Sequence, residues 1–350
     1  MYHFGTACPD ARREMSPHMG VRQGKQGLCP WGSIASQNDM GYHISDMMGA
    51  KSMTPKISLK GCFPPIPTPF DNRSRVDHNQ LALNLEKWQK TPLSGFVVLG
   101  SNGEAVSLKE EEKLETWRTA RSAIHKDRLF VAGTGCESTN ETLELTEKAS
   151  KIGADAALVV TPHYYKGKMD HRALVNHYTT VANESPIPII LYNVPDFTGI
   201  DMGAETIIAL ANHPNVVGVK DSSGNVVKMG QVIGAAPKGF QILAGSGSFL
   251  LPALVMGAVG GVMALAAVAS HALAEMVERY EGGDLVKARE IQIRLLPVNA
   301  AVTKQFGIAG LKGAMDLMGM YGGPVRLPLL PLEGGQKKEI EGILRKAGLL

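Results

Sequence analysis

Short apolar runs rich in β-branched residues alternate with amphipathic segments from about residue 59 onward, and this alternation constrains the fold more than any other feature. Eight runs have the length of a buried strand: 61–66, 96–99, 129–132, 156–160, 187–191, 216–219, 241–244 and 261–265. Segments with the helical spacing of apolar residues lie between most of them, at 108–124, 141–152, 171–182 and 204–211. Successive runs begin about 20 to 35 residues apart, which is the length of one strand–helix unit. Strands that alternate with helices form a parallel sheet.

Eight such units predict an α/β protein of the (β/α)8 barrel class rather than a doubly wound sheet. A dinucleotide-binding sheet would require G-x-G-x-x-G directly after its first strand. The nearest match, Gly245-Ser-Gly247, comes late and lacks the third glycine. Residues 56–270 are therefore assigned to the barrel. Residues 271–350, which are helical in pattern with Gly and Pro breaks, are assigned to a C-terminal helical extension.

Residues 1–55 differ from the rest of the chain, because they lack hydrophobic periodicity and are rich in Met, Gly, Ser and Gln. This composition predicts a disordered N-terminal extension. The segment has no apolar signal-peptide core, and acidic residues interrupt the acid-poor pattern of a transit sequence. Two interpretations stay open: a targeting segment, or a stretch that precedes a true start at Met53. We expect a cytoplasmic protein, with mitochondria as the alternative.

Composition and spacing exclude several classes of partner. The net charge is +3 and no dense basic block with interleaved aromatics occurs, so no nucleic-acid partner is expected. The four cysteines are far apart without a C-x-x-C pair, and the histidines show no H-E-x-x-H spacing, so no disulfide framework and no metal site is predicted. Residues 249–270 carry no charge, but Pro252 and three glycines interrupt them. We interpret them as a buried helix and a buried strand, and expect no membrane partner.

Lys220 stands at the end of the apolar run Val216-Val-Gly-Val219, where a buried ammonium group is costly to desolvate. Taken alone it would be interpreted as half of a solvated ion pair. In a (β/α)8 barrel, however, catalytic groups gather at the carboxyl ends of the strands. The other predicted strand ends carry small, hydroxylated and phenolic residues, in the runs Gly100-Ser-Asn-Gly-Glu104, Gly133-Thr-Gly135, Thr161-Pro-His-Tyr-Tyr165, Tyr192-Asn-Val-Pro195 and Gly245-Ser-Gly247. Together these residues predict one site around Lys220.

That set of side chains suits imine chemistry. An apolar pocket lowers the pKa of a lysine amine, so part of it is neutral and nucleophilic near pH ~7. Such an amine converts a ketone into a carbinolamine and then into a protonated imine, which accepts the electrons of a breaking C–C bond. Each step moves a proton, which a tyrosine hydroxyl can carry. Backbone N–H groups at 100–103 suit a substrate carboxylate, while Glu104 is interpreted as a structural partner.

Over about residues 57–330 the chain resembles the dihydrodipicolinate synthase / N-acetylneuraminate lyase family of class I aldolases. The resemblance rests on four motifs in order: Gly100-Ser-Asn-Gly-Glu104, Thr161-Pro-His-Tyr-Tyr165, Tyr192-Asn-Val-Pro195 and Val219-Lys-Asp221. It implies a (β/α)8 barrel with C-terminal helices, a homotetramer, a small oxo-acid substrate and no cofactor.

The resemblance also implies a role for individual residues. Lys220 matches the Schiff-base lysine, and Tyr192 matches the tyrosine that relays protons to the imine and the leaving oxygen. Tyr164 matches the tyrosine that completes this relay, which the family contributes across a subunit interface. Ser101 and Asn102 match the residues that bind the pyruvyl carboxylate and pass a proton. Two further matches line the substrate pocket, Ser222 and Gly245.

Two departures from the family pattern bear on the substrate. Phe197 lies two residues after Pro195, where the synthases carry an arginine that pairs with the carboxylate of their aldehyde substrate, and phenylalanine cannot form that pair. Asn102 replaces the usual threonine of its turn. Several runs are similar to 4-hydroxy-2-oxoglutarate aldolase within the family, namely 100–104, 132–139, 160–167, 299–303 and 321–324.

We therefore expect a carbon–carbon lyase that cleaves a 4-hydroxy-2-oxo acid, such as 4-hydroxy-2-oxoglutarate, to pyruvate and an aldehyde such as glyoxylate. Two alternatives stay open. One is 4-hydroxy-tetrahydrodipicolinate synthase, which condenses pyruvate with aspartate semialdehyde. The other is a non-catalytic barrel that binds an oxo acid. The sequence does not specify the aldehyde, because the pocket beyond the pyruvyl end depends on loops.

Overall fold

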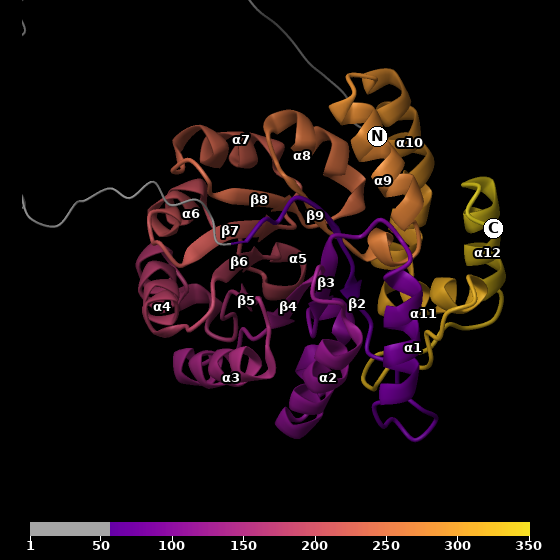
Figure 1. Cartoon of the computed structure of the whole chain (residues 1–350), viewed down its shortest axis with the longest axis horizontal. Helices are drawn as coiled ribbons and strands as arrows, with labels where there is room; N and C mark the ends of the chain where they lie inside the picture. Colours follow the sequence, from indigo (N-terminus) through magenta and orange to yellow (C-terminus); the bar gives the residue numbers. More distant parts are fainter. Residues whose placement is uncertain (1–56) are drawn as a thin grey trace, which may run out of the picture. The chain divides into compact units, whose positions relative to one another are not determined.

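A ring of parallel strands forms the centre of the chain, which this computed structural model describes over residues 57–350 (Figure 1). The expectations for residues 1–55 lie outside the described residues. The strand order is β1-β9-β8-β7-β6-β5-β4-β3-β2, and every neighbouring pair is parallel. β1 and β2 are two parts of one strand interrupted at Pro64; β1 pairs with β9 and β2 pairs with β3, so the ring closes. This is the predicted (β/α)8 barrel.

The strands begin and end close to the apolar runs of the sequence. Their bounds are β1 (Gly61–Phe63), β2 (Pro65–Ile66), β3 (Gly95–Val98), β4 (Leu129–Gly133), β5 (Ala156–Val160), β6 (Ile189–Asn193), β7 (Val216–Asp221), β8 (Gln241–Ala244) and β9 (Gly260–Val262). The strand expected at 261–265 is shorter than predicted, because a 3-10 turn begins at Ala264. β6 and β7 extend two residues beyond their apolar runs, so Tyr192 and Lys220 lie within strands rather than after them.

Helices follow the strands in regular alternation and surround the ring. Within residues 57–350 eight of them cover the barrel: α1 (His78–Trp88), α2 (Glu110–Ala123), α3 (Thr139–Ile152), α4 (His171–Glu184), α6 (Ala204–Ala211), α7 (Val226–Ala235), α8 (Leu250–Met256) and α9 (Ser270–Glu281). The short α5 (Pro195–Thr198) directly follows β6. Helices α3 and α4 have side-chain N-caps, because Ser138 and Asp170 accept hydrogen bonds from backbone N–H groups in their first turns.

Three further helices follow the barrel, in agreement with the expected C-terminal helical region. They are α10 (Leu285–Ala300), α11 (Gly307–Leu317) and α12 (Gln336–Lys346), with a π-helical turn at Ala301–Gln305 between the first two. Figure 1 shows them gathered on one side of the barrel, near α9 and α1. The boundary at residue 270 between barrel and extension stays a prediction.

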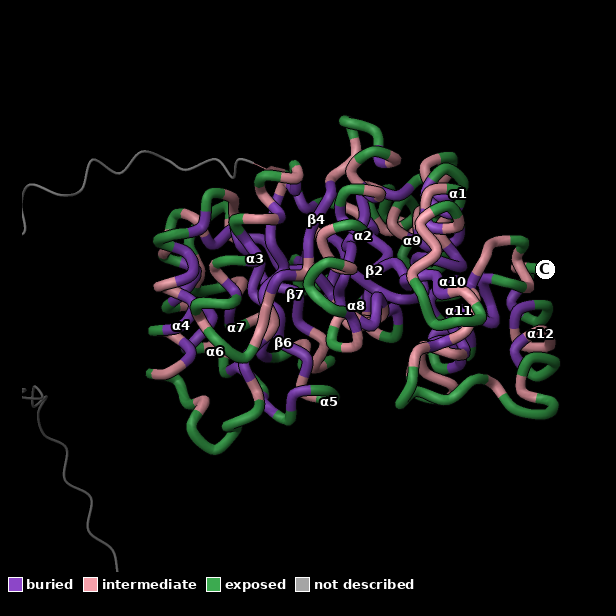
Figure 2. The backbone as a smooth tube through the Cα atoms, turned by 90° about the horizontal axis from the view of Figure 1, so that it is seen from below, coloured by how far each residue is buried: buried purple, intermediate pink, exposed green. Residues whose placement is uncertain are grey.

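Two apolar layers are buried, one inside the ring and one between the ring and the helices. Successive side chains of a strand point to opposite faces, so each strand supplies both layers. The inner layer consists of Leu59, Phe63, Val97, Val131, Leu158, Ile190, Leu243 and Val262, and within the described chain it leaves no room for a water molecule. Figure 2 shows the strands buried throughout, whereas the helices expose their outer faces.

The uncharged stretch 249–270 belongs to this core. It forms α8 and then β9, and Leu250 and Leu265 are completely buried, as the interpretation of a buried helix followed by a buried strand predicts. Among residues 57–350, no helix combines the length and the apolarity that crossing a membrane requires.

Pairs of histidine and threonine side chains join neighbouring helices around the barrel. On α4, His177 Nδ1 lies 2.9 Å from Thr139 Oγ1 of α3, and His171 Nδ1 lies 2.9 Å from Thr206 Oγ1 of α6. His177 is only 6% exposed, and its Nε2 has no hydrogen-bond partner among residues 57–350, whereas His171 is exposed. Burial lowers the pKa of His177 from 6.5 to about 4.

We predict that His177 makes the fold less stable in mild acid. The unfolded chain binds a proton at this side chain below pH 6.5 and the folded chain does so only near pH 4. Stability is therefore fully present above pH 6.5 and is lost as the pH falls toward 4. Between about pH 7 and about pH 5 the loss is about 1.5 kcal/mol.

Urea denaturation of the wild type and of His177→Gln at the two pH values measures this loss. The variant should lack this part of the pH dependence, while His171→Gln, on the exposed end of the same helix, should keep it. An equal pH dependence in all three proteins would contradict the prediction.

Candidate active site

Lys220 and Tyr192 are direct neighbours on β7 and β6, with their side chains on the same face of the sheet. Lys220 Nζ lies 3.8 Å from the centroid of the Tyr192 ring, and the two residues are 3% and 5% exposed. A shift in register produces this pairing, because Ile189 pairs with Val216 whereas the next residue pairs with Gly218. Without the shift, Tyr192 would pair with Val219, and Lys220 would point to the opposite face of the sheet.

The next residues along the two strands, Asn193 and Asp221, also pair, and their side chains face outward toward the helices. Asn193 Nδ2 donates hydrogen bonds to Asp221 Oδ1 at 2.9 Å and to Asp201 Oδ1 at 2.7 Å. Lys228 Nζ of α7 lies 3.2 Å from Asp221 Oδ2 and 2.5 Å from Asp201 Oδ1. This buried polar network joins the strands directly behind Lys220 and Tyr192.

Ser101 and Asn102 lie in the 3-10 turn Ser101–Gly103 that follows β3. Ser101 Oγ is 3.2 Å from Tyr192 Oη, and either hydroxyl can donate the proton of this hydrogen bond. The structure therefore brings together three of the residues expected in the site, a lysine amine, a tyrosine and a serine hydroxyl. Asn102 is half-buried in the same turn.

Ser222 and Gly245 lie next to each other at the ends of β7 and β8. The Ser222 N–H donates to Asn193 O at 2.9 Å, and the Gly245 N–H donates to Asp221 O at 2.8 Å. A Cβ atom at Gly245 would lie only 2.0 Å from Ser222 Oγ. Glycine at 245 thus allows Ser222 to pack at the carboxyl end of the barrel, one strand from Tyr192.

Tyr164 is not brought to the other site residues. It is 75% exposed, its ring packs edge-on against Tyr165 with 5.1 Å between centroids, and its backbone N–H donates to Glu137 Oε2 at 2.7 Å. Among residues 57–350 its hydroxyl has no hydrogen-bond partner. Phe197, on α5 directly after β6, is also exposed, at 65%.

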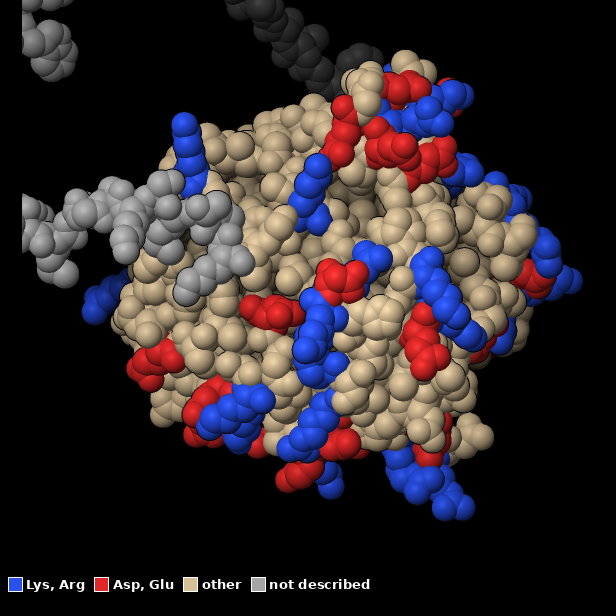
Figure 3. All heavy atoms as spheres, in the orientation of Figure 1, with Lys and Arg blue, Asp and Glu red and all other residues tan. Residues whose placement is uncertain are grey.

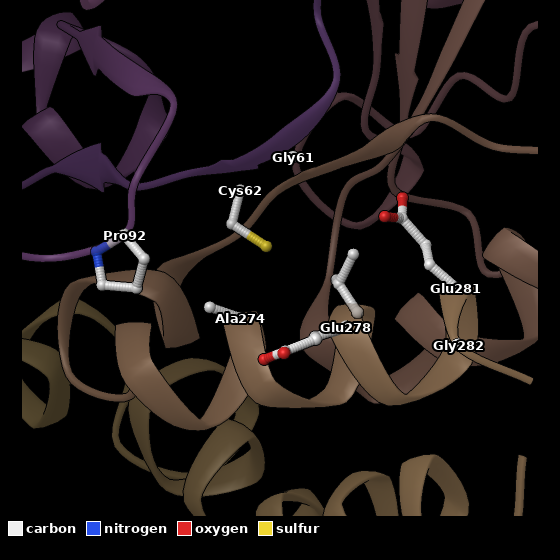
Figure 4. Close-up of a pocket in the computed structure, with 8 residues that line it drawn as sticks. Gly61, Cys62, Pro92, Ala274, Glu278, Glu281 and Gly282 are labelled. Carbon is white, nitrogen blue, oxygen red and sulfur yellow. The ribbon is translucent and has the colours of Figure 1, made fainter. Parts of the chain in front are cut away.

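A cavity of about 520 Å³ lies elsewhere, at the amino-terminal end of the barrel (Figure 4). It is lined by Gly61, Cys62, Pro92, Ala274, Val277, Glu278, Glu281 and Gly282, none of which belongs to the expected site. Burial raises the pKa of the Cys62 thiol to about 12, so this thiol stays protonated and unreactive at neutral pH. The cavity is therefore separate from the imine chemistry.

The described residues offer no metal-binding cluster, and the face in view in Figure 3 carries charges of both signs. Within the described part of the chain, no three His, Cys, Asp or Glu side chains are placed to share a metal ion. Figure 3 shows blue and red side chains interspersed over the face in view, rather than the continuous basic surface typical of nucleic-acid binding.

Comparison with known proteins identifies the family and supports the fold. The model of the dihydrodipicolinate synthetase family matches residues 58–347. The chain belongs to this family. The family consists of carbon–carbon lyases that work through a lysine imine, so the chain is such an enzyme.

Relatives in the dihydrodipicolinate synthetase family match along almost their whole length. 4-Hydroxy-tetrahydrodipicolinate synthase of Methanothrix thermoacetophila is 36% identical over 82% of this chain and 97% of its own. The crystal structure of dihydrodipicolinate synthase from Bacillus anthracis superposes with a TM-score of 0.80 at 28% identity, over 83% and 98% of the two chains. The enzyme from Acinetobacter baumannii, solved in complex with pyruvate, gives a TM-score of 0.79 at 30% identity, over 84% and 100%.

Part of the network behind the site could not be predicted from the sequence. Asn193 and Asp221 stand in the motifs without a predicted role, and nothing in the sequence indicates that Asp201 and Lys228 join them. The only available signal was a charged residue on the apolar helix α7, and a single such charge is usually solvated.

We predict that Lys228→Met destabilises the fold by about 3 kcal/mol, because it leaves the buried Asp221 carboxylate without its cation. The free energy of unfolding from urea titration measures the change. Lys151→Met is the matched control, since Lys151 pairs with Glu147 on the surface of α3 and its loss should have little effect. Equal effects of the two substitutions would show that the buried network does not stabilise the strand ends.

Proposed function

We propose that this enzyme is a class I aldolase that cleaves a 4-hydroxy-2-oxo acid, such as 4-hydroxy-2-oxoglutarate, to pyruvate and an aldehyde, here glyoxylate. The observation that carries the imine chemistry is the buried Lys220 amine beside the Tyr192 ring, with the Ser101 hydroxyl in hydrogen-bond contact with Tyr192. Within residues 57–350, no carboxylate forms an ion pair with Lys220.

The proposed reaction uses this arrangement step by step. Lys220 Nζ attacks C2 of the substrate, and loss of water from the carbinolamine gives a protonated imine. The C4 hydroxyl then loses its proton through Tyr192 Oη, the C3–C4 bond breaks, and its electron pair moves to the imine nitrogen to give an enamine. The aldehyde leaves, C3 takes up a proton, and water hydrolyses the imine to release pyruvate. The Ser101–Tyr192 hydrogen bond provides the route for these protons.

The substrate carboxylate next to C2 is assigned to the turn after β3. Ser101 and Asn102 offer a hydroxyl and an amide there, together with the backbone N–H groups of a glycine-flanked turn. Ser222 and Gly245 form the neighbouring wall. No cofactor is needed, because the imine itself accepts the electrons.

The choice of aldehyde rests on Phe197. An arginine at this place would pair with the carboxylate of aspartate semialdehyde, and a phenylalanine cannot. The second candidate function is the synthase reaction, the condensation of pyruvate with aspartate semialdehyde. It is favoured by the names of curated relatives, such as the 4-hydroxy-tetrahydrodipicolinate synthase of Methanothrix thermoacetophila at 36% identity. Phe197 is the observation on this chain that counts against aspartate semialdehyde as the aldehyde, and thereby against the synthase reaction.

Reduction with borohydride in the presence of pyruvate tests the imine. We expect one pyruvyl group per chain, attached to Lys220, and no addition to Lys220→Ala. Intact-protein mass and peptide mapping measure both. An unmodified wild type would refute the imine mechanism. Pyruvate binding that persists in Lys220→Ala, without turnover in the wild type, would support the non-catalytic alternative.

A comparison of two reactions tests the substrate. The wild type should have the higher kcat/KM for cleavage of 4-hydroxy-2-oxoglutarate than for condensation of pyruvate with aspartate semialdehyde. Phe197→Arg should raise kcat/KM for the condensation about tenfold, because a charge-assisted hydrogen bond to the aldehyde carboxylate becomes possible. Phe197→Leu is the matched control without a charge. A wild type that condenses faster than it cleaves would establish the synthase instead.

We also propose that the enzyme is a homotetramer in which Tyr164 acts on the site of a neighbouring subunit. The exposure of Tyr164, whose hydroxyl has no hydrogen-bond partner among residues 57–350, supports this assignment. Residence in the cytoplasm, with mitochondria as the alternative, stays part of the proposal.

Co-expression of two inactive variants tests the role of Tyr164. Tyr164→Phe and Lys220→Ala should each lose most activity, because each removes a group that the reaction requires. In a mixed oligomer, a Lys220→Ala subunit contributes an intact Tyr164 to a neighbour that has an intact lysine. About a quarter of the activity should therefore return when random dimers form. Absence of any recovery in a proven mixed oligomer would place Tyr164 outside the relay.

A further inference from the structure

The turn that carries Ser101 and Asn102 has a strained backbone. Leu99 and Glu104, on its two sides, both have left-handed conformations, with φ of 64° and 54°. Residues other than glycine rarely adopt this conformation, and they keep it only where the surroundings enforce it. Backbone bonds from Gly103 N–H to Gly100 O and from Glu104 N–H to Ser101 O close the turn.

Glu104 joins this turn to the opposite end of the chain. Its carboxylate is fully buried; Oε1 lies 2.6 Å from Lys312 Nζ of α11, and Oε2 accepts the backbone N–H of Arg326 at 2.8 Å. Both oxygens therefore contact residues that follow the barrel. The sequence predicts a structural role for Glu104, and in the structure this carboxylate pairs with Lys312.

Lys312 is held on three sides. Besides Glu104, its ammonium donates to Pro324 O at 2.7 Å and lies 4.5 Å from the centroid of the Phe70 ring. The side chain is 2% exposed, and burial lowers the pKa of Lys312 while Glu104 opposes that effect. Replacement of either Lys312 or Glu104 alone would leave the other charge buried without its counterion.

Arg326 continues this contact on the outer side. Its guanidinium binds the Glu112 carboxylate of α2 through two hydrogen bonds of 2.8 Å, and it donates to Ser107 O, which is three residues after Glu104, at 2.8 Å. It also lies 4.3 Å from the centroid of the Phe70 ring. Lys312 and Arg326 thus both bind residues at the end of the turn or just after it.

A second turn of the site, which follows β8, is also held by side chains of the C-terminal helices, here through neutral hydrogen bonds. Asn299 of α10 accepts the Gly247 N–H at 3.2 Å and donates to Ser246 Oγ at 3.1 Å, and Gln292 donates to Gly247 O at 2.8 Å. These residues directly follow Gly245. Helices α10 and α11 therefore contact the turns after β3 and β8, on both sides of the barrel closure.

Stability alone does not account for a buried Glu–Lys pair. Apolar residues of similar volume in place of such a pair often give an equally stable protein, because the ions lose their hydration. A buried ion pair does, however, fix the positions of the groups that it joins.

We propose that Lys312 and Glu104 are positioning residues, through which helix α11 holds Ser101 and Asn102 in the geometry that receives the substrate carboxylate. The proposal rests on the function given above only in assigning that carboxylate to this turn.

Lys312→Met tests the proposal through pyruvate trapping by borohydride. Loss of the ammonium frees the turn, so the pyruvate concentration for half-maximal trapping should rise about tenfold. The extent at saturating pyruvate should stay at one pyruvyl group per chain, because Lys220 is untouched. Partial unfolding would have the opposite signature, a reduced extent with an unchanged half-saturation. A half-saturation within twofold of the wild type would overturn the proposal.

Hydrogen–deuterium exchange gives a readout that needs no substrate. Exchange at the amides of Gly103, Glu104 and Ser107 should be about tenfold faster in Lys312→Met, because their backbone bonds close the turn. Lys337→Met is the matched control, since Lys337 contacts Asp316 at the surface of the same α11. Unchanged exchange in the turn would contradict the proposal even if the wild type formed no imine.

The double variant Glu104→Gln/Lys312→Met keeps the test valid if the single variant does not fold. It leaves no unpaired buried charge, so we expect a folded protein by circular dichroism. Its half-saturation should still be raised, because the ion pair is absent. A folded double variant with wild-type half-saturation and wild-type exchange would show that packing alone positions the turn.

Discussion

The pairing of Tyr192 with Lys220 across β6 and β7 is the constraint on which the site depends. A one-residue shift in register puts the two side chains on the same face, and the Asn193–Asp221 hydrogen bond on the opposite face keeps the strands in that register. The geometry of the strand ring then brings the Lys220 amine, the Tyr192 phenol and the Ser101 hydroxyl together. A polar network outside the barrel thus determines which groups meet inside it.

The fold could be predicted because its signals are local. β-branched runs and amphipathic helices are properties of short windows, and Ser138 and Asp170 are caps that act within one turn. The extra length of β6 and β7 could not be predicted from such local signals. Their last residues are polar, and only pairing with a neighbouring strand makes such residues part of a sheet.

The site was predictable in its parts and not in its assembly. Lys220, Tyr192 and Ser101 stand at strand ends, and parallel strands bring their ends together. The link between Glu104 and Lys312 joins two distant segments through single charges, and neither charge differs in sequence from an exposed one. The exposed position of Tyr164 likewise depends on how its loop leaves β5.

The packed inner layer closes the barrel on the amino-terminal side of Lys220 and Tyr192, so these side chains face the carboxyl end. Phe63, Leu158 and Leu243 leave no space for a water molecule between them, so this layer separates the amino-terminal cavity from Lys220 and Tyr192. In the proposed reaction, water and both products therefore use the carboxyl end of the barrel. The aldehyde forms when the C3–C4 bond breaks and pyruvate forms only on the later hydrolysis of the imine, so the aldehyde leaves first and pyruvate second.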